Sequence, residues 1–575
     1  MAALDGGQEI EADDGSRSLG RSAAVLMQLL VLVAITALSL LPGLATLPPI
    51  DRDEPHYLEA TRQMVTSGDH IDIRFQDQPR YQKPVGIYWL QSLAVAATGE
   101  GAKASIAAYR AVSVAGLLIS VLGVFWIGSM LFGRNAGFVA ALMIAGIAGT
   151  GFEGRIGKTD AMLLAVTVIA QGALARIHAD VRSGRDGRTW PALVFWLAQG
   201  VGVLIKGPIS LLASGFTVIG LSVLERDWCW LKRLRPVAGG LLLALVVFPW
   251  PLLLYQRTGW VFLHTAVGDD LLGKVADGQQ SHGAPPGYYV LTFSLMVWPF
   301  GAMAVGAGLA AIDRWRLSPA LRFCLCWYLP FWLVFEVIAT KLPHYVLPAY
   351  PALALLLGWA ATGADVPRFG DLAAWQRWLW RFAAFGVAAV TLVLAGLVIG
   401  APFYFHVAFP PVAVFIAALI LTAGGLGLAT GLEVRWKRIV GMAIAAATAY
   451  GLFFGLFAPA LTPLWPSRSI ARIVAAAKPC PTTTMALAGY HEPSIVFLLG
   501  ERTRLTDLAG VADHLQHDPA CALAVVPAAQ FATVKATLAK QGLPLRRLDE
   551  VEGLDLGGGG WVDLDVVTSA SDTRR

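Results

Sequence analysis

The stretch IAAYRAVSVAGLLISVLGVFWIGSML, residues 106–131, carries a single charged side chain, Arg110, in 26 residues. About 20 apolar residues cross the roughly 30 Å hydrocarbon core of a bilayer as an α-helix. Similar stretches recur through the first 460 residues. The one at 24–45 is too long for a signal peptide and lacks a small-residue cleavage site, which predicts a retained anchor. The sequence therefore predicts a helical, polytopic membrane protein.

The composition of the whole chain supports this prediction. Of its 575 residues, 56% are hydrophobic and 14% are charged, and the mean hydropathy is +0.60. These values exclude an ordinary soluble protein of this length. The net charge of +5 is scattered along the chain, so nucleic acid is not an expected partner. The five cysteines form no Cys-X-X-Cys pattern, and thiol redox motifs or metal clusters are not expected.

Apolar runs separated by charged breaks predict about thirteen membrane spans. Alternate loops between them are rich in arginine and lysine, for example 182–188, 232–235 and 435–438. Because such loops stay in the cytoplasm, the N-terminus is predicted inside and the chain after about residue 460 outside. The predicted spans are 24–45, 106–131, 135–151, 160–178, 190–205, 208–225, 237–255, 287–311, 321–339, 344–361, 380–400, 411–431 and 437–458.

This topology divides the chain into three parts. Residues 1–22 form a cytoplasmic segment, and 23–460 form the transmembrane domain with long outer loops at 46–105 and 256–286. Residues 461–575 are predicted to form a small α/β domain on the outer side. Its expected elements are helices at 467–478, 511–516 and 528–540, β-like runs at 484–489 and 522–527, and two later β-like runs.

Two cysteines, Cys480 and Cys521, are predicted to lie outside the membrane on the outer side. An oxidising compartment allows a disulfide between them to persist. We expect this bridge, with two unrelated half-buried cysteines as the alternative.

Ionisable side chains gather on the predicted outer side of the spans. Such groups are costly beside hydrocarbon and need a partner or a function there. A single lysine is explained as a snorkelling side chain, but snorkelling gives no reason for acids and bases to gather on the face that is poor in Lys and Arg. The residues concerned are Asp51, Asp53, Glu54, Lys83, Arg155, Lys158, Asp160, Lys206, Lys341 and His344.

The run 53–57, Asp-Glu-Pro-His-Tyr, follows the first span. Pro55 at a first helical position predicts a helix that begins directly after the two carboxylates. Tyr57, Ala60 and Met64 would then share a face along the membrane surface. A carboxylate at the mouth of the membrane domain can act as a general base on a hydroxyl, if it is partly desolvated and close to a cation.

Five motifs in order resemble the membrane glycosyltransferases that include protein O-mannosyltransferases and bacterial lipid A aminoarabinose transferases. They are the run 53–57, Arg80–Pro84 with Tyr88–Leu90, the turn Lys158–Asp160, the run Lys206–Pro208 and the run Lys341–Pro351. The resemblance implies a GT-C-like all-α membrane fold with a small C-terminal α/β extracytoplasmic domain. It also implies direct transfer of a sugar, with inversion, from a polyprenyl-phosphate donor.

The same resemblance implies roles for particular residues. Asp53 matches the catalytic base of the family, Asp160 its second acidic position, and Lys83 and Lys341 its binders of the lipid phosphate. Cations at that phosphate would stabilise the charge that develops as the glycosidic bond breaks. Further residues expected to contact substrate are Glu54, His56, Tyr57, Tyr81, Lys206, Lys274, His282 and Tyr345.

The chain also departs from the aminoarabinose transferases. His56 stands where they usually have Arg, and Gln82 stands where they have Glu, a metal ligand in them. No metal ligand is therefore assigned, and a divalent metal ion stays open as a cofactor. The loop at 269–274 lacks their His- and Arg-bearing pattern, so Lys274 and His282 either contact phosphate or acceptor or are plain loop residues.

The predicted function is that of an inverting glycosyltransferase of the bacterial inner membrane. Its acceptor would be a hydroxyl or phosphate of an envelope glycolipid such as lipid A, of another glycan or of a protein, at the periplasmic face. A secondary transporter is one alternative, but transporters place polar groups near the midplane between repeats, and the sequence has no internal repeat. A non-catalytic lipid-binding subunit of the same fold is the other alternative, and a dispensable Asp53 would favour it.

Reporter fusions test the predicted topology. A reporter that works only in the periplasm should be active after residue 470, and one that works only in the cytoplasm should be active within 182–188, because arginine-rich loops are retained inside. Paired phosphatase and galactosidase activities measure both positions. The opposite pattern would move every proposed site residue to the cytoplasmic face.

Overall fold

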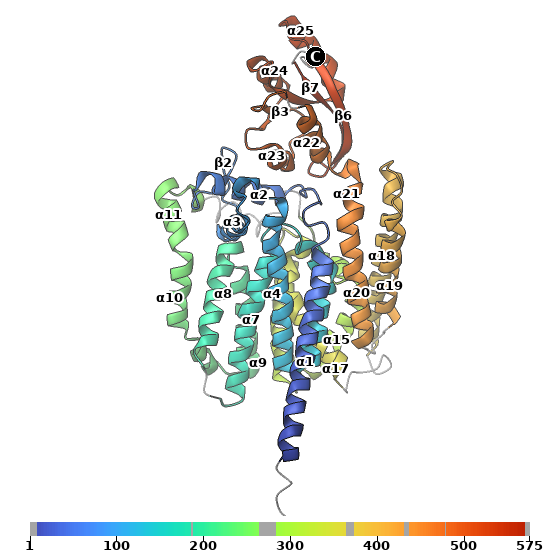
Figure 1. Cartoon of the computed structure of the whole chain (residues 1–575). Coiled ribbons are helices and arrows are strands. Elements are labelled where there is room, and N and C mark those ends of the chain that lie inside the picture. The colour runs from blue at the N-terminus through green and yellow to red at the C-terminus, as the bar shows by residue number, and fades with distance from the viewer. Residues whose placement is uncertain are drawn as a thin grey trace, which may run out of the picture.

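The computed structural model describes residues 8–185, 188–263, 283–363, 373–429, 436–477 and 479–569, with side chains from residue 22 onward. Figure 1 shows a bundle of long, roughly parallel helices with a smaller part that contains the C-terminal sheet above one end. Helices α2 (Glu54–Ser67) and α3 (Gly86–Thr98) lie across that same end of the bundle. The polytopic helical fold predicted from the sequence is confirmed.

The described residues contain nine helical segments long and apolar enough to cross a membrane. These are α1 (Gln8–Leu40), α4 (Ile106–Phe132), α7 (Asp160–Arg182), α10 with α11 (Pro236–Thr258), α16 (Pro319–Val337), η5 with α17 (Pro343–Thr362), α18 (Ala374–Tyr404), α19 (Val412–Ala429) and α20 to α21 (Trp436–Ala460). Shorter apolar helices are α5 (Arg134–Gly146), α8 (Trp190–Lys206) and α9 (Ile209–Glu225). With one bent pair, they match the thirteen predicted spans in order.

That bent pair corrects the prediction of a continuous span at 287–311. The chain bends by 118° between helices α14 (Tyr288–Met296) and α15 (Gly301–Arg314). The break between them contains Pro299, which has no amide hydrogen and disfavours helical backbone at the residue before it. The carbonyl of Trp298 accepts a hydrogen bond from Ala148 N at 3.0 Å, so a backbone group freed by the break is satisfied.

Small residues set the spacing of the helices that carry the site. A β-carbon on Gly116 of α4 would lie 2.8 Å from the carbonyl oxygen of Ala161 on α7, and one on Gly358 of α17 would lie 2.1 Å from that of Ala136 on α5. Membrane helices without a hydrophobic driving force between them associate through such close backbone contacts. The contact at Gly116 holds the outer ends of α4 and α7 together.

The loop at 46–105, which the predicted topology makes the first outer loop, folds across one end of the bundle. It contains α2, the two-residue strands β1 (Arg74–Phe75) and β2 (Gln78–Pro79), α3, and the short helix η1 (Gly101–Lys103). Helix α2 begins directly after Asp53 with Pro55 in its first turn, as predicted. Its residues Tyr57, Ala60 and Met64 share a buried apolar cluster with residues of α3, so this face packs against protein.

The C-terminal part is built around a five-stranded sheet with the order β4-β3-β5-β7-β6. Its central strand β5 (Leu523–Pro527) pairs in parallel with β3 (Met485–Leu487), which in turn pairs in parallel with β4 (Arg504–Leu505). Strand β7 (Gly560–Thr568) runs antiparallel to β5 and forms a hairpin with β6 (Arg546–Asp555). A disulfide joins Cys480 and Cys521 with their Cα atoms 5.3 Å apart, which confirms the predicted bridge.

Most helices of this part agree with the sequence prediction. Helices α22 (Pro466–Ala477), α24 (Leu508–His517) and α25 (Phe531–Lys540) correspond to the three predicted helices. Helix α23 (Pro493–Leu499) was not predicted. It is seven residues long and almost wholly apolar, a pattern that does not distinguish a short helix from a buried strand.

Candidate active site at one end of the bundle

A buried ion pair anchors the first outer loop to the bundle. The guanidinium of Arg110 on α4 donates two hydrogen bonds to the Glu54 carboxylate, each at 2.8 Å, and both side chains are at most 1% exposed. The carboxylate also accepts from Ile50 N at 2.9 Å and from Gly157 N at 2.7 Å. Arg110 donates its other hydrogen bonds to the carbonyl oxygens of Leu44, Leu47 and Pro48. The loop before α2 and the turn before α7 are therefore held at one point.

A second polar cluster lies where α6 (Ala148–Glu153), α7, α8 and η5 (Pro343–Ala349) meet. Lys158 Nζ is 3.0 Å from Glu153 Oε2 and 3.6 Å from Asp160 Oδ2, and Lys206 Nζ is 2.5 Å from Asp160 Oδ1. The His344 imidazole lies 3.4 Å from Glu153 and 3.7 Å from Asp160. Acids and bases alternate through this buried cluster, so each charge has a partner of opposite sign, which burial demands.

A polar cavity of about 260 Å³ lies between this cluster and the first outer loop. The exposed carboxylate of Asp53 lies in its wall together with the cations of Arg80, Lys83, Lys158 and Lys206. A small space lined by one exposed acid and several cations can hold an anionic group beside a potential base.

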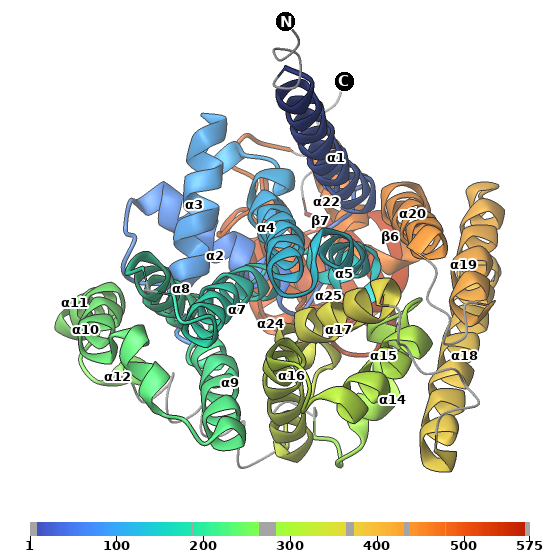
Figure 2. The same cartoon turned by 90° about the horizontal axis from the view of Figure 1, so that it is seen from below.

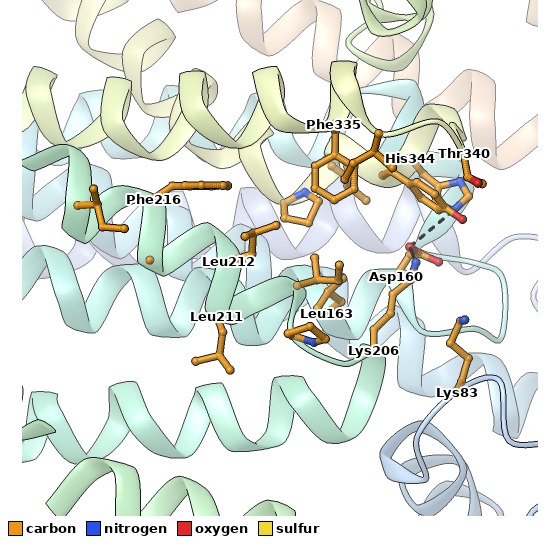
Figure 3. Close-up of a pocket in the computed structure, with 18 residues that line it drawn as sticks. Lys83, Asp160, Leu163, Lys206, Leu211, Leu212, Phe216, Phe335, Thr340 and His344 are labelled. Atoms are coloured by element: carbon orange, nitrogen blue, oxygen red, sulfur yellow. Dashed lines mark hydrogen bonds and ion pairs between the residues drawn. The ribbon is translucent and has the colours of Figure 1, made fainter. Parts of the chain in front are cut away.

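An apolar cavity of about 500 Å³ adjoins the polar one. The two share Lys83, Asp160 and Lys206 in their walls, as well as His344 and Tyr345. Figure 3 shows the charged side chains at one end, whereas Leu211, Leu212 and Phe216 line the part away from them. The combination fits an amphiphile whose anionic head lies at the lysines and whose apolar chain extends between α7, α9 and α16.

Seven of the predicted site residues line the polar cavity. They are Asp53, Glu54, Tyr57, Lys83, Asp160, Lys206 and Tyr345. The ammonium of Lys206 also lies 5.2 Å from the centre of the Tyr345 ring, within the range of a cation–π contact. Sequence motifs separated by almost 300 residues therefore meet around one space.

Among the described residues, two other predicted ones, Tyr81 and Lys341, lie outside this cavity wall. Tyr81 donates a hydrogen bond to Asp72 at 2.7 Å within the first loop. Lys341 donates to the carbonyl oxygens of Ala284 and Ile338, and is not part of either cavity wall. Lys274 and His282 lie outside the described residues.

His56 supports the loop rather than lining the cavity. Burial lowers the pKa of its imidazole to about 4, so the ring is neutral at pH 7. Its Nδ1 lies 2.6 Å from the carbonyl oxygen of Arg52, and a neutral ring can make this contact only by donating Nδ1–H. The hydrogen bond fixes the backbone just before Asp53.

Sequence reasoning missed two residues of this arrangement. Glu153 ends an apolar run, and a lone acid in such a run was a signal that it needed a partner. Arg110 is the one charge in its span, but its partner Glu54 is 56 residues away and only the fold brings them together. Arg155 lies in the turn before α7, with Lys158 and Asp160, and its side chain is buried with the guanidinium 3.9 Å from the centre of the Phe454 ring.

The residues that line the polar cavity do not fit a dedicated divalent-metal site. Such sites need several free oxygen ligands. Here Glu54 is bound by Arg110, Asp160 by two lysines, and Asp51 by Ser494 N. Several cationic side chains in the same wall would repel a metal ion.

The fold and the paired cavities at one end of it define the class: a GT-C-like polytopic membrane protein. Residues 82–253 match the family of dolichyl-phosphate-mannose-protein mannosyltransferases. The fold is similar to that of ArnT from Cupriavidus metallidurans in a crystal structure bound to undecaprenyl phosphate, with a TM-score of 0.71 at 16% identity over 96% of this chain and 99% of that one. An archaeal oligosaccharyltransferase, AglB from Archaeoglobus fulgidus, gives a TM-score of 0.52 at 11% identity over 94% of this chain and 74% of that one.

Two curated relatives carry the comparison further. The undecaprenyl phosphate-alpha-4-amino-4-deoxy-L-arabinose arabinosyl transferase of Aeromonas hydrophila is 27% identical over 59% of this chain, and the enzyme of the same name from Aeromonas salmonicida is 29% identical over 60%. The matched part spans 61% of each relative's length. The resemblance predicted from the sequence is confirmed.

Replacing Arg110 by methionine should destabilise the protein strongly. The change leaves the Glu54 carboxylate buried without its cation, a loss of about 3–5 kcal/mol. Thermal unfolding of the purified protein in detergent measures the effect. Lys103→Met, which removes an exposed cation just before α4, is the matched control. The double variant Glu54→Gln with Arg110→Met should recover part of the loss, and a double variant worse than either single change would contradict the assignment.

Proposed function

We propose that this protein is an inverting glycosyltransferase of the bacterial inner membrane that uses a polyprenyl-phosphate sugar as donor. One observation carries the proposal: the exposed Asp53 carboxylate lines a polar cavity whose lysines also close one end of a long apolar cavity. A reaction between a lipid-borne phosphate ester and a hydroxyl needs these features together. The names of the relatives support the same donor class.

The apolar cavity suits the isoprenoid chain of the donor, and Lys83 and Lys206 suit its phosphate. Both ammonium groups belong to the shared end of the two cavities, so a chain in one would leave its head group in the other. Lysine is a strong partner for phosphate through charge-assisted hydrogen bonds. Asp160 holds Lys206 in place and lowers the net positive charge of the site.

In the proposed reaction, the Asp53 carboxylate accepts the proton of the acceptor hydroxyl. The acceptor oxygen forms a bond to the anomeric carbon from the side opposite the phosphate, and the bond from that carbon to the phosphate oxygen breaks. The electron pair leaves with the lipid phosphate, and the configuration at the anomeric carbon inverts. Lysines 83 and 206 stabilise the negative charge that grows on the departing phosphate.

The acceptor would be a hydroxyl-bearing envelope glycolipid, another glycan or a protein at the periplasmic face. The arginine-rich alternate loops support this orientation, with 1–22 in the cytoplasm and 461–575 as a periplasmic domain. The Cys480–Cys521 disulfide agrees with an oxidising compartment. A transporter is less favoured, because the charged cluster lies at the helix ends and the break between α14 and α15 contains Trp298 and Pro299 instead of charged groups.

Asp53→Asn should abolish transfer while donor binding persists. The amide keeps the shape of the side chain but cannot accept a proton, and general-base catalysis contributes about 10²–10⁴-fold. Turnover is measured with purified protein and the lipid-linked sugar that accumulates in cells lacking it. Asp77→Asn, an exposed acid of the same loop, is the control. Near-normal turnover of Asp53→Asn would remove Asp53 from this role.

Lys83→Ala should weaken donor binding or slow transfer by about tenfold or more, because one charge-assisted contact to the phosphate is lost. Lys83→Arg keeps the charge and should retain most of the activity. Equilibrium binding of undecaprenyl phosphate, together with turnover, separates the two effects. An unchanged affinity and an unchanged rate in Lys83→Ala would count against this contact.

A further inference from the structure

Helix α23 of the C-terminal domain is held at one end by Asp51, two residues before Asp53, and at the other by Arg62 of the helix that follows Asp53. Asp51 Oδ1 accepts a hydrogen bond at 2.9 Å from Ser494 N in the first turn of α23. Arg62 of α2 donates to the carbonyl oxygens of Phe497 at 2.7 Å and Val496 at 3.3 Å in its last turn. A carboxylate at the start and a guanidinium at the end satisfy terminal backbone groups and complement the helix dipole.

The side chains of α23 also reach into the membrane domain. The Phe497 ring contacts Tyr109 of α4 edge-on, with 5.8 Å between ring centres, and shares a buried cluster with Leu58 of α2 and Val95 of α3. The guanidinium of Arg62 lies 5.0 Å from the centre of the same ring. Figure 1 shows α23 at the lower side of the C-terminal domain, next to α2.

The residue between Asp51 and Asp53 has strained backbone. Arg52 has a φ of +81°, which side chains with a β-carbon rarely adopt. Its guanidinium donates to the carbonyl oxygen of Gly557 at 3.3 Å, in the turn between β6 and β7. Glu492 accepts a hydrogen bond from the amide of the same Gly557, which ties this turn to the start of α23. Strained backbone persists only where its surroundings hold it.

We infer that the C-terminal domain is a positioning element for the catalytic loop. In this inference α23 and Gly557 hold Asp51 and Arg52, and thereby direct the Asp53 carboxylate into the polar cavity. Asp51, Arg52 and Arg62 are positioning residues that need not touch substrate. The inference rests on the proposed function in so far as Asp53 is the base, but the docking of the loop can be measured apart from any chemistry.

Turnover of four variants tests the role of the contacts. Asp51→Ala and Arg62→Met, the latter made together with Glu59→Gln because Arg62 also pairs with the buried Glu59 carboxylate, each remove one end of the α23 clamp. Each should lower kcat about tenfold to a hundredfold, because small displacements of a catalytic group are costly. Binding of undecaprenyl phosphate should stay unchanged. Asp51→Asn keeps the accepting oxygen and should retain most of the turnover. Gln76→Ala is the control. It removes hydrogen bonds to Glu501 and Thr503 of the C-terminal domain but leaves the contacts of Asp51, Arg52 and Arg62 intact, and it should behave as wild type.

Hydrogen–deuterium exchange of the full-length protein in detergent reports the docking directly. The backbone amides of residues 50–54 and of His56 should exchange faster in Asp51→Ala and Arg62→Met than in wild type or Gln76→Ala. Unchanged exchange in both variants, or an equal loss of turnover in Gln76→Ala, would overturn the inference. If the variants show the expected faster exchange, but the wild type neither transfers sugar nor binds undecaprenyl phosphate, the proposed function fails. The positioning of the loop around Asp53 then still stands.

Discussion

The ion pair between Glu54 and Arg110 is the constraint on which the site end of the helical bundle depends. Both groups are almost fully buried, and removing two charges from water is favourable only where further hydrogen bonds compensate the lost hydration. The carboxylate accepts hydrogen bonds from two backbone amides, and the guanidinium donates hydrogen bonds to carbonyl oxygens of the turn that follows α1. A shift of the loop would separate Glu54 from Arg110 and leave each of these buried charges without its partner.

The proposed chemistry follows from what this anchor brings together. Asp53 is the neighbour of Glu54 in the chain, and Gly157, bound to the same carboxylate, lies next to Lys158. The anchor thereby sets the distance between an exposed acid and the cluster of Lys158, Asp160 and Lys206. Together with Glu153, which pairs with Lys158, these residues give two lysines and two carboxylates, so a lysine-lined pocket can exist beside hydrocarbon and still attract a phosphate. The apolar cavity then continues directly from the charged end.

Much of the fold could be predicted because hydrocarbon imposes a simple rule on sequence. Each span needs about 20 apolar residues, and arginine marks the loops that stay inside. The rule does not detect breaks inside a span, which is why continuous helix was predicted across the bend at Pro299. The rule also does not apply outside the membrane, where the seven almost wholly apolar residues of α23 are as typical of a strand as of a helix.

The sequence by itself determined the membrane class, the order of the spans, the helix that starts after Asp53 and the group of motifs that gather charge at one end. Those features depend on local composition and on residues close together in the chain. Only the tertiary structure decided that Arg110 holds Glu54, that Lys341 is taken by backbone carbonyls, and that α23 lies against the loop of Asp53. These depend on which partner each polar group finds once water is excluded, and the partners lie tens to hundreds of residues apart.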